Sequence, residues 1–394
     1  MVKNIAFYDE ALEQKAIAEH YTSHAALIAE GVLHNKGLHF TTTAPHQAFP
    51  SENSMTLIWE TNMPTDATVK WGAAEDALDH SEELAANGQR IRQYTIGGLE
   101  ASTSYYYQVE VANDQGETVV SEVLPFRTAA VAGEPILFAA ISDTEARPHV
   151  NTHVGRLIYR ESPHLLINVG DVTDGGKEPN RVEWTHEYFA AMGHFMSRVP
   201  MLPVMGNGED DFKWFEHYHA LPEGARSYYS YRYGDVAFFI LDSNLQDREE
   251  QDPQFRPTQR EWFDKALEDN SDATWKIVAF HHPTLPDRYP FVVDDFVPII
   301  EKHAVDLVLV GHHHNYRRSW PLKDGLTPAE EGPIYIQLGG GGGNVSSRPN
   351  SPDPRYAMTY QGYGYSMFRV HGGKLYYTMH DDTGAVRDLF TLEK

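Results

Sequence analysis

The sequence predicts a two-domain protein in which an all-β sandwich precedes an α/β domain of packed sheets flanked by helices. The chain has 394 residues, which exceeds the usual size of one domain. Apolar and polar residues alternate in short runs up to about residue 128, as they do in strands with one buried face. Beyond residue 135, apolar runs alternate with helical patterns, and this change marks a second domain.

The first domain is predicted to span residues 38–130, a size typical of a small β-sandwich. Residues 55–59 and 105–111 alternate with period two, so each predicts a strand with one buried face. Residues 98–105 resemble the turn and tyrosine corner of fibronectin type III domains, with Ala101 where proline is common. We therefore expect a fibronectin type III-like sandwich.

Two segments frame this sandwich. Residues 1–37 are interpreted as an N-terminal helical extension that lacks the apolar core of a signal peptide. Residues 128–135 have the small, Gly- and Pro-containing composition of a linker, so we expect the second domain to span 131–394. The compartment stays open: the periplasm or extracellular space is favoured if a signal was removed, and the cytoplasm otherwise.

The second domain is expected to begin with strands that alternate with helices and to end in consecutive antiparallel strands. The apolar runs predict strands at 136–141, 165–169, 201–205, 236–241, 275–280, 305–310, 334–338, 365–370, 375–379 and 389–392. Helices are expected at 150–161, at 179–199 with a proline at its start, at 258–268 and at 294–303.

Composition excludes several classes of protein. The net charge of -24 argues against a general binder of nucleic acid or of anionic membranes, because the chain would repel both. No apolar stretch approaches the ~20 residues that a membrane-spanning helix needs. The absence of cysteine excludes disulfides, a thiol nucleophile and thiolate metal ligands. We expect a small phosphate ester as the partner, and the oligomeric state cannot be read from the chain.

Five of the predicted strands end in short clusters of metal-liganding side chains. The clusters contain Asp143 and Glu145, Asp171 and Asp174, Asn207, His281 and His282, and His312, His313 and His314. Each alone has an ordinary explanation, such as a helix cap, a turn or a structural histidine. Five in one order, each at a strand exit, indicate a two-metal hydrolytic site along one edge of a sheet.

The order and spacing of these clusters resemble the calcineurin-like metallophosphoesterases, and the preceding sandwich makes the purple acid phosphatases the most similar subgroup. The resemblance implies hydrolysis of phosphate esters, with phosphomonoesters favoured. It also implies that one metal is held by Asp143, Asp171 and His314, and the other by Asp171, Asn207, His281 and His312.

Asp171 would then bridge the two metals. A carboxylate between two cations offsets their repulsion at ~3.5 Å and helps to polarise a bridging water into the attacking hydroxide. Imidazole and oxygen ligands without sulfur suit iron, manganese or zinc.

Two departures from the family pattern concern the first metal. Glu145 stands where the family often has a histidine ligand, and Asp174 stands where purple acid phosphatases have the tyrosine that gives the colour. Either carboxylate could complete the metal shell, and we favour Glu145, because Asp174 is equally well explained as a turn residue before two glycines. The protein is expected not to be purple.

A third departure concerns the reaction. Gly208 stands where the family usually has a histidine that acts on the leaving group. The loss of a general acid typically costs about 10²- to 10⁴-fold in rate. Phosphodiesterase activity on activated esters, or a metal-binding protein with weak or no catalysis, are therefore the alternatives. The candidates for a replacement group are His282 and His313, which otherwise support the metal ligands, and His149, His153 and Asp210.

The glycine-rich segment 339–344 lies near the last cluster in the order of the chain. It lacks the Lys-Ser/Thr pair of a phosphate-binding P-loop and does not open an obvious helix. We interpret it as backbone that passes close to the site, where side chains would not fit.

Overall fold

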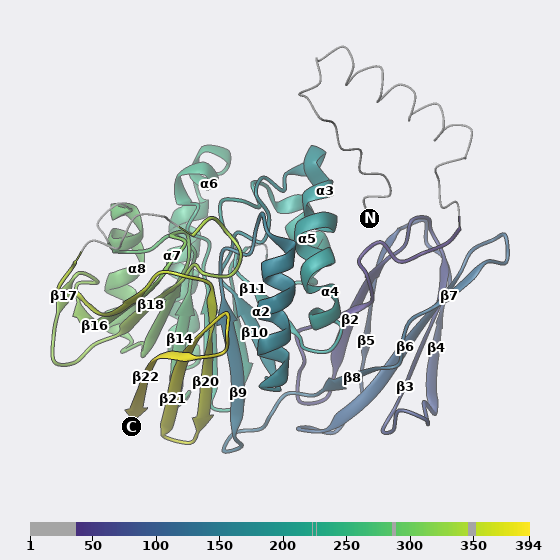
Figure 1. Ribbon diagram of the computed structural model, residues 1–394, viewed down its shortest axis with the longest axis horizontal. Helices are drawn as coiled ribbons and strands as arrows, with labels where there is room; N and C mark the ends of the chain where they lie inside the picture. Colours follow the sequence, from purple (N-terminus) through teal and green to yellow (C-terminus); the bar gives the residue numbers. More distant parts are fainter. Residues whose placement is uncertain (1–36, 223, 226, 286–288, 346–351) are drawn as a thin grey trace, which may run out of the picture.

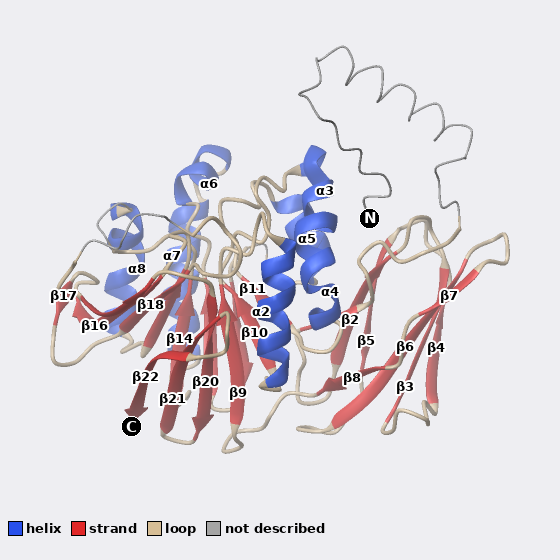
Figure 2. Ribbon diagram, in the orientation of Figure 1, coloured by secondary structure: helices blue, strands red, loops and turns tan. Residues whose placement is uncertain are grey.

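The computed structural model describes residues 37–394 except 223, 226, 286–288 and 346–351. The predicted N-terminal extension lies outside the described residues apart from Gly37. Figures 1 and 2 show a β-sandwich beside a larger α/β domain, as the sequence predicts. Among the described residues, no helix has both the length and the apolar character that crossing a membrane requires.

The first domain packs two antiparallel sheets face to face. One sheet has the order β1 (His46–Ala48), β2 (Met55–Glu60), β5 (Ile91–Ile96); the other has the order β4 (His80–Leu84), β3 (Asp66–Gly72), β6 (Ser104–Ala112), β7 (Thr118–Val120), with β8 (Leu124–Arg127) paired to β6. Alternate residues such as Leu57, Trp59 and Val109 fill the space between the sheets. The tyrosine corner is present, because the Tyr105 hydroxyl accepts a hydrogen bond of 3.0 Å from the Glu100 amide.

The second domain contains two stacked sheets. The six-stranded sheet has the order β11 (Met201–Pro203), β10 (Leu165–Asn168), β9 (Ile136–Ile141), β20 (Gly364–His371), β21 (Lys374–Asp381), β22 (Val386–Glu393). The eight-stranded sheet has the order β12 (Tyr229–Tyr233), β13 (Val236–Ile240), β14 (Trp275–Ala279), β15 (Leu307–Val310), β18 (Ile334–Leu338), β16 (Tyr316–Lys323), β17 (Thr327–Pro328), with β19 (Tyr356–Tyr360) paired to β16.

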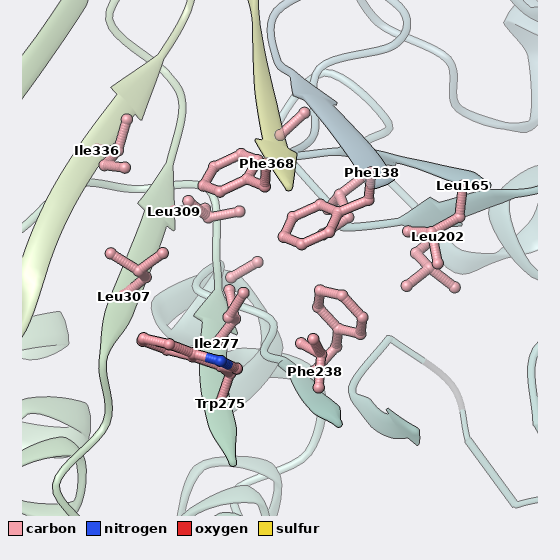
Figure 3. Packing of buried hydrophobic residues seen from close by; sticks show 14 of the residues in the cluster. Phe138, Leu165, Leu202, Phe238, Trp275, Ile277, Leu307, Leu309, Ile336 and Phe368 are labelled. Atoms are coloured by element: carbon pink, nitrogen blue, oxygen red, sulfur yellow. The ribbon is translucent and has the colours of Figure 1, made fainter. Parts of the chain in front are cut away.

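Aromatic and aliphatic side chains fill the space between these two sheets. Figure 3 shows Phe138 from the first sheet meeting Phe238 from the second, and their ring centroids are 5.2 Å apart. The Phe138 ring also stacks on Phe368 at 4.5 Å. Nearly continuous apolar runs such as 236–240 are buried on both faces, because helices cover the outside of each sheet.

The helices form two outer layers. On the six-stranded sheet lie α2 (Pro148–Arg160), α4 (Ala190–Met196) and α5 (Phe212–His219); on the eight-stranded sheet lie α6 (Leu245–Gln251), α7 (Phe255–Asp269) and α8 (Pro290–Lys302). The short α3 (Arg181–Glu183) has no buried residue. The predicted helices at 150–161, 258–268 and 294–303 correspond to α2, α7 and α8. The sequence did not indicate α5 or α6.

The predicted continuous helix 179–199 is wrong in detail. A 3₁₀ turn (Glu178–Asn180) and α3 lead into a π-helix (Trp184–Phe189), and only then does α4 begin. The wider π turn places Trp184, Tyr188 and Phe189 on one buried side, at spacings of four and five residues. An α-helical pattern search therefore recognises the segment but not its irregular turn.

Buried polar contacts join the two domains. Gln47 Nε2 and the Tyr107 hydroxyl both donate to the Ser197 carbonyl at the end of α4, each over 2.8 Å. Glu60, which is 2% exposed, pairs with Arg181. Each of these contacts joins a residue of the sandwich to a residue of the second domain. Together they hold the sandwich against α4 and the segment before it.

Two neutral histidines lie in the same interface. His46 on β1 bonds through Nε2 to the Tyr218 carbonyl over 2.9 Å, and its buried Nδ1 has no hydrogen-bond partner in the described part of the chain. His219 bonds through Nε2 to the Tyr188 hydroxyl, also over 2.9 Å. Burial lowers the pKa of His46 to about 4 and that of His219 to about 3, so both rings are uncharged at neutral pH.

Candidate metal centre

The five clusters meet where the carboxyl ends of strands from both sheets face each other. Asp143 follows β9, Asp171 follows β10 and Asn207 follows β11, all in the six-stranded sheet; His281 follows β14 and His312 follows β15, both in the eight-stranded sheet. The expectation of a single sheet edge is thus corrected. The site lies between two sheet edges, because the sheets stack with these ends together.

The side chains form two adjacent groups of possible metal ligands. In the first group, His314 Nε2 lies 3.4 Å from Asp143 Oδ1 and 3.1 Å from Glu145 Oε1. In the second, His281 Nε2 lies 3.1 Å from Asp171 Oδ2, and His312 offers a further nitrogen. Each group places its ligand atoms within 4.8 Å of one another, which suits the coordination of one cation.

Asn207 and His312 connect the second group to the first. Asn207 Oδ1 lies 2.9 Å from His312 Nδ1, so both side chains point into the same space. The backbone amide of His312 donates to Asp143 Oδ2 over 3.0 Å. The first and second groups therefore share one polar network rather than forming separate sites.

Other predicted residues lie elsewhere. Asp174 is exposed and belongs to neither group of the described residues, because its loop turns outward and its amide donates to Glu187 Oε2 over 3.0 Å. His153 is also exposed, and its Nε2 contacts the Asp382 carbonyl. His149 and Asp210 are exposed side chains. Glu145, which the sequence favoured over Asp174, is the carboxylate that the structure brings to the first group.

Charge pairing dominates the electrostatics of the centre. Burial alone would lower the pKa of His281, but the Asp171 carboxylate raises it to about 10. The neighbouring Asp143 carboxylate raises the pKa of His314 to about 9. Burial and the neighbouring Asp143 carboxylate raise the pKa of Glu145 to about 8. A dense cluster of buried carboxylates thus favours positive charge at its centre.

The residues present fit metal ions. Asp143 Oδ1, Glu145 Oε2 and His281 Nε2 are buried, and none of them has a hydrogen-bond partner among the described residues. Leaving such atoms unsatisfied costs about 1–3 kcal/mol each, which is unusual in a well-packed region. The set contains oxygen and imidazole donors and no sulfur, so it suits hard or borderline cations such as iron, manganese or zinc.

The backbone is strained at three of these positions. Asp143, Asp171 and His312 have φ angles of 56°, 51° and 69°, in the left-handed region that non-glycine residues rarely adopt. These conformations turn the chain sharply just after β9, β10 and β15. Strain at three candidate ligands indicates that their direction matters more than local stability.

Glu209 belongs to the third cluster of the sequence, residues 206–209, but the sequence did not predict a role for it. It is fully buried, and its carboxylate accepts hydrogen bonds from the amides of Asp171, Val172 and Gly206. These contacts tie the loop after β10 to the loop after β11. The only signal was its place two residues after Asn207, which does not distinguish a support from a ligand.

Gly208 lacks a side chain because none fits there. A Cβ atom at this position would lie 2.0 Å from the Thr173 carbonyl oxygen. The 173–176 loop closes over Gly208, whose own carbonyl accepts hydrogen bonds from the amides of Gly175 and Gly176. A histidine here would require a different loop, so the absence of this residue is built into the backbone.

His282 and Tyr289 lie behind the second group. His282 is 8% exposed, and its Nδ1 lies 3.0 Å from the Ser243 hydroxyl. The Tyr289 hydroxyl contacts Nε2 of His312, and the Tyr289 ring lies 4.7 Å from His282. His313 is partly buried, with its ring 5.2 Å from His312. Sequence reasoning did not identify Tyr289, since an isolated tyrosine in a loop carries no pattern.

The glycine-rich segment passes close to the first group, as predicted. The amides of Gly341 and Gly343 donate to the carbonyls of Ser142 and Asp143 over 2.9 and 2.8 Å. A Cβ atom at Gly343 would lie 2.4 Å from Glu145 Oε1. The glycines allow the backbone to reach the buried cluster and close one side of it.

Two family models match this chain. The model described as calcineurin-like phosphoesterase matches residues 136–316. The model described as the purple acid phosphatase N-terminal domain matches residues 42–128. The two matches follow the domain order seen in the structure.

Individual proteins show the same similarity. An uncharacterized protein of Mycobacterium tuberculosis is 22% identical over 68% of this chain, and the match spans only 61% of that relative's length. Fe(3+)-Zn(2+) purple acid phosphatase 12 of Arabidopsis thaliana is 23% identical over 81% of this chain and 76% of its own. The solved purple acid phosphatase from yellow lupin (Lupinus luteus) seeds has a TM-score of 0.73 and 18% identity, covering 89% of this chain and 74% of that one.

Proposed function

Because the chain belongs to the calcineurin-like phosphoesterases, in the purple acid phosphatase-like arrangement of two domains, we propose that it hydrolyses small phosphate esters and favours monoesters. The observation that carries this proposal is the pair of adjacent groups of possible metal ligands at the junction of two sheet edges. Several of their ligand atoms are buried and make no hydrogen bond to the described residues. A pair of cations at such a junction suits phosphoryl transfer, since the phosphoryl oxygens carry the charge to be neutralised.

We assign the side chains to the two ions as follows. Asp143, Glu145 and His314 would hold one ion, Asn207, His281 and His312 would hold the other, and Asp171 would lie between them. When bound, the ions would supply positive charge to the phosphoryl group and lower the pKa of a coordinated water. An iron(III) and zinc(II) pair, as in the name of the Arabidopsis relative, is one combination that this donor set accepts.

The protein's own contribution is to orient the ligands. His281 Nδ1 contacts the Val169 carbonyl over 2.8 Å, which directs Nε2 toward Asp171. Gly208 donates from its amide to Asp171 Oδ1 over 2.7 Å and so fixes the second oxygen of this carboxylate. The bridging role of Asp171 therefore rests on one fixed oxygen and one oxygen beside His281.

The closed backbone at Gly208 bears on the choice of substrate. Without a side chain there, the leaving group receives no proton from this position, and esters with good leaving groups are favoured. A phosphodiesterase acting on activated esters is the second candidate for this reason. Comparing hydrolysis of p-nitrophenyl phosphate with that of its bis ester decides between the two, because a monoesterase prefers the first.

A pair of matched variants tests the central assignment. Asp171→Asn keeps the shape of the side chain and removes its charge, whereas Asp174→Asn makes the same change three residues away in an exposed position. We expect Asp171→Asn to lose bound metal and at least about 10³-fold in kcat. Asp174→Asn should retain both. Metal analysis and p-nitrophenyl phosphate hydrolysis are the measurements.

The outcomes separate the remaining alternatives. Full metal content and full activity in Asp171→Asn would show that the bridging assignment is wrong. Wild-type protein that holds two equivalents of metal but turns over neither ester would instead be a metal-binding protein with little catalysis.

A further inference from the structure

A second region of concentrated positive charge lies away from the metal centre, in a groove between α2 and α4. The groove is a cavity of about 370 Å³, a size suited to a small ligand. Its rim carries Arg156 and Arg160 from α2, and Arg198 just after α4. Three arginines around one cavity are unexpected in a chain of net charge -24.

Two of these arginines, Arg156 and Arg160, have no partner among the described residues. Within the part of the chain that the structure describes, neither Arg156 nor Arg160 makes an ion pair or a side-chain hydrogen bond, and both are exposed. Arg160 lies in the last turn of α2, where its positive charge interacts favourably with the negative end of the helix dipole. Arg156 lies one turn earlier, and this explanation does not extend to it.

Arg198 is already fixed in position. Its Nη1 donates to the His194 carbonyl and to the Ser197 hydroxyl over 3.0 and 2.9 Å, and its Nη2 donates to Glu122 over 2.7 Å. Glu122 is 71% exposed, so water and salt weaken its pairing. Among the residues that the structure describes, the groove therefore holds one oriented guanidinium and two unpaired ones, and one exposed carboxylate, that of Glu122, lines it.

The groove has an apolar part. Gly155, Ala191 and Phe195 line it between the two helices. The helices pack closely, because a Cβ atom on Gly155 would lie 3.2 Å from Met192 Sδ. Tyr159 is 43% exposed and forms an aromatic wall.

We propose that this groove binds a small organic oxyanion, with a phosphate, sulfate or carboxylate head held by the arginines and an apolar body against Tyr159 and Phe195. Guanidinium groups bind such heads through paired, charge-assisted hydrogen bonds. The bound anion would also relieve the mutual repulsion of the three arginines.

The groove is separate from the metal centre. Arg156 and Arg160 lie eight and twelve residues after Pro148, the first residue of α2, which itself follows the loop of the first ligand group. At 1.5 Å per residue they lie about 12 and 18 Å along the helix from that end. Figure 1 shows α2 running away from the loops of the centre beside the sandwich.

Calorimetric titration with phenylphosphonate, whose C–P bond is not an ester, tests the proposal. The metal-loaded full-length protein should bind it in two events, one at the metal centre and one in the groove. In the double variant Arg156→Ala/Arg160→Ala, the Kd for binding in the groove should rise at least tenfold. This variant should keep wild-type hydrolysis of p-nitrophenyl phosphate. Asp171→Asn should keep the groove event.

Lys265→Ala/Lys374→Ala is the matched control, since it removes two positive charges from exposed positions outside the groove. This variant should retain both events. An unchanged titration in the arginine variant, with circular dichroism showing native folding, would overturn the proposal. Inorganic sulfate tests the apolar part: we expect at least tenfold weaker binding in the groove, and equal binding would refute a role for Tyr159 and Phe195.

Discussion

Histidines are buried in two regions of this protein with opposite electrostatic results. His281 at the metal centre is 0% exposed and His46 at the domain interface is 1% exposed. The pKa of His281 is raised to about 10 because Asp171 outweighs the effect of burial, whereas the pKa of His46 falls to about 4 because burial dominates. The same residue type thus serves two purposes, and its hydrogen-bond partner decides which.

The difference shows how the two regions were assembled. At the interface, a backbone carbonyl bonds one nitrogen of His46 and a tyrosine hydroxyl bonds one nitrogen of His219, and both rings stay neutral. At the centre, carboxylates outnumber their partners, and several buried atoms stay unsatisfied. Burial of histidine alone therefore does not indicate a metal site, but burial beside unsatisfied carboxylates does.

The most direct way to break this comparison is to exchange His281 for asparagine. We expect the variant to lose one equivalent of metal and about 10³-fold or more in kcat, because the second ligand group loses its buried nitrogen. Metal analysis and steady-state kinetics provide the readouts. A variant that folds, judged by circular dichroism, and that keeps both metals would contradict the assignment of His281.

The interface histidine should respond to acid rather than to metal. Above pH 6.5 the His46 ring is neutral in both states; as the pH falls from about 6.5 to about 4, only the unfolded chain takes up the proton. Protonation in the folded state is opposed because Nδ1 has no acceptor. This group should therefore cost about 3 kcal/mol of stability by pH 4.

Urea unfolding between pH 7.5 and 4.5 measures this dependence. His46→Gln keeps a donor for the Tyr218 carbonyl and removes the titrating ring, so its stability should fall less steeply with acid than that of the wild type. Parallel profiles for the two proteins would show that His46 does not carry the effect.

Within the metal centre, Glu145 is the finer test. Glu145→Gln removes one negative charge from the first ligand group and should weaken the binding of one metal by about tenfold to a hundredfold, with less effect on the other. Metal competition with a chelator measures both affinities. Asp174→Asn supplies the exposed control. Equal metal affinities in these two variants would argue against Glu145 as a ligand of the first metal.

Substitution of Tyr289 should have the smallest effect on metal affinity. Its hydroxyl contacts Nε2 of His312, which leaves Nδ1 directed toward Asn207. Tyr289→Phe should weaken the binding of one metal ion by a few-fold, because a lost hydrogen bond costs about 1 kcal/mol. Tyr376→Phe, at a 48% exposed tyrosine on β21, is the control. No change in chelator competition would remove Tyr289 from the support of His312.

The sequence predicted the domain order and most strands because buried apolar runs are a strong local signal. Residues 136–141 and 334–338 are strands with the predicted bounds. The residues that were missed act through contacts that a linear pattern does not contain. Glu209 supports three amides, two of them from a loop far along the chain, and Tyr289 acts only once His312 is near it.

The same limit explains why the sequence did not decide between Glu145 and Asp174. Glu145 and Asp174 were both reasonable ligands by spacing, and only the path of the 173–176 loop over Gly208 separates them. The loss of a histidine at position 208 was visible in the sequence. Its physical reason, a carbonyl oxygen in the space of a side chain, required the fold.

The division of the centre between two sheets has a consequence for how the protein matures. The His312 amide bonds to the Asp143 carboxylate across 169 residues of sequence, so the ligand set does not exist until the two sheets have stacked. A nascent or half-folded chain would offer only isolated fragments of the set, with weak hold on any ion. Metal would then bind tightly only after the two sheets have assembled. The bound ions would slow the separation of the sheets, because they contact ligands from both.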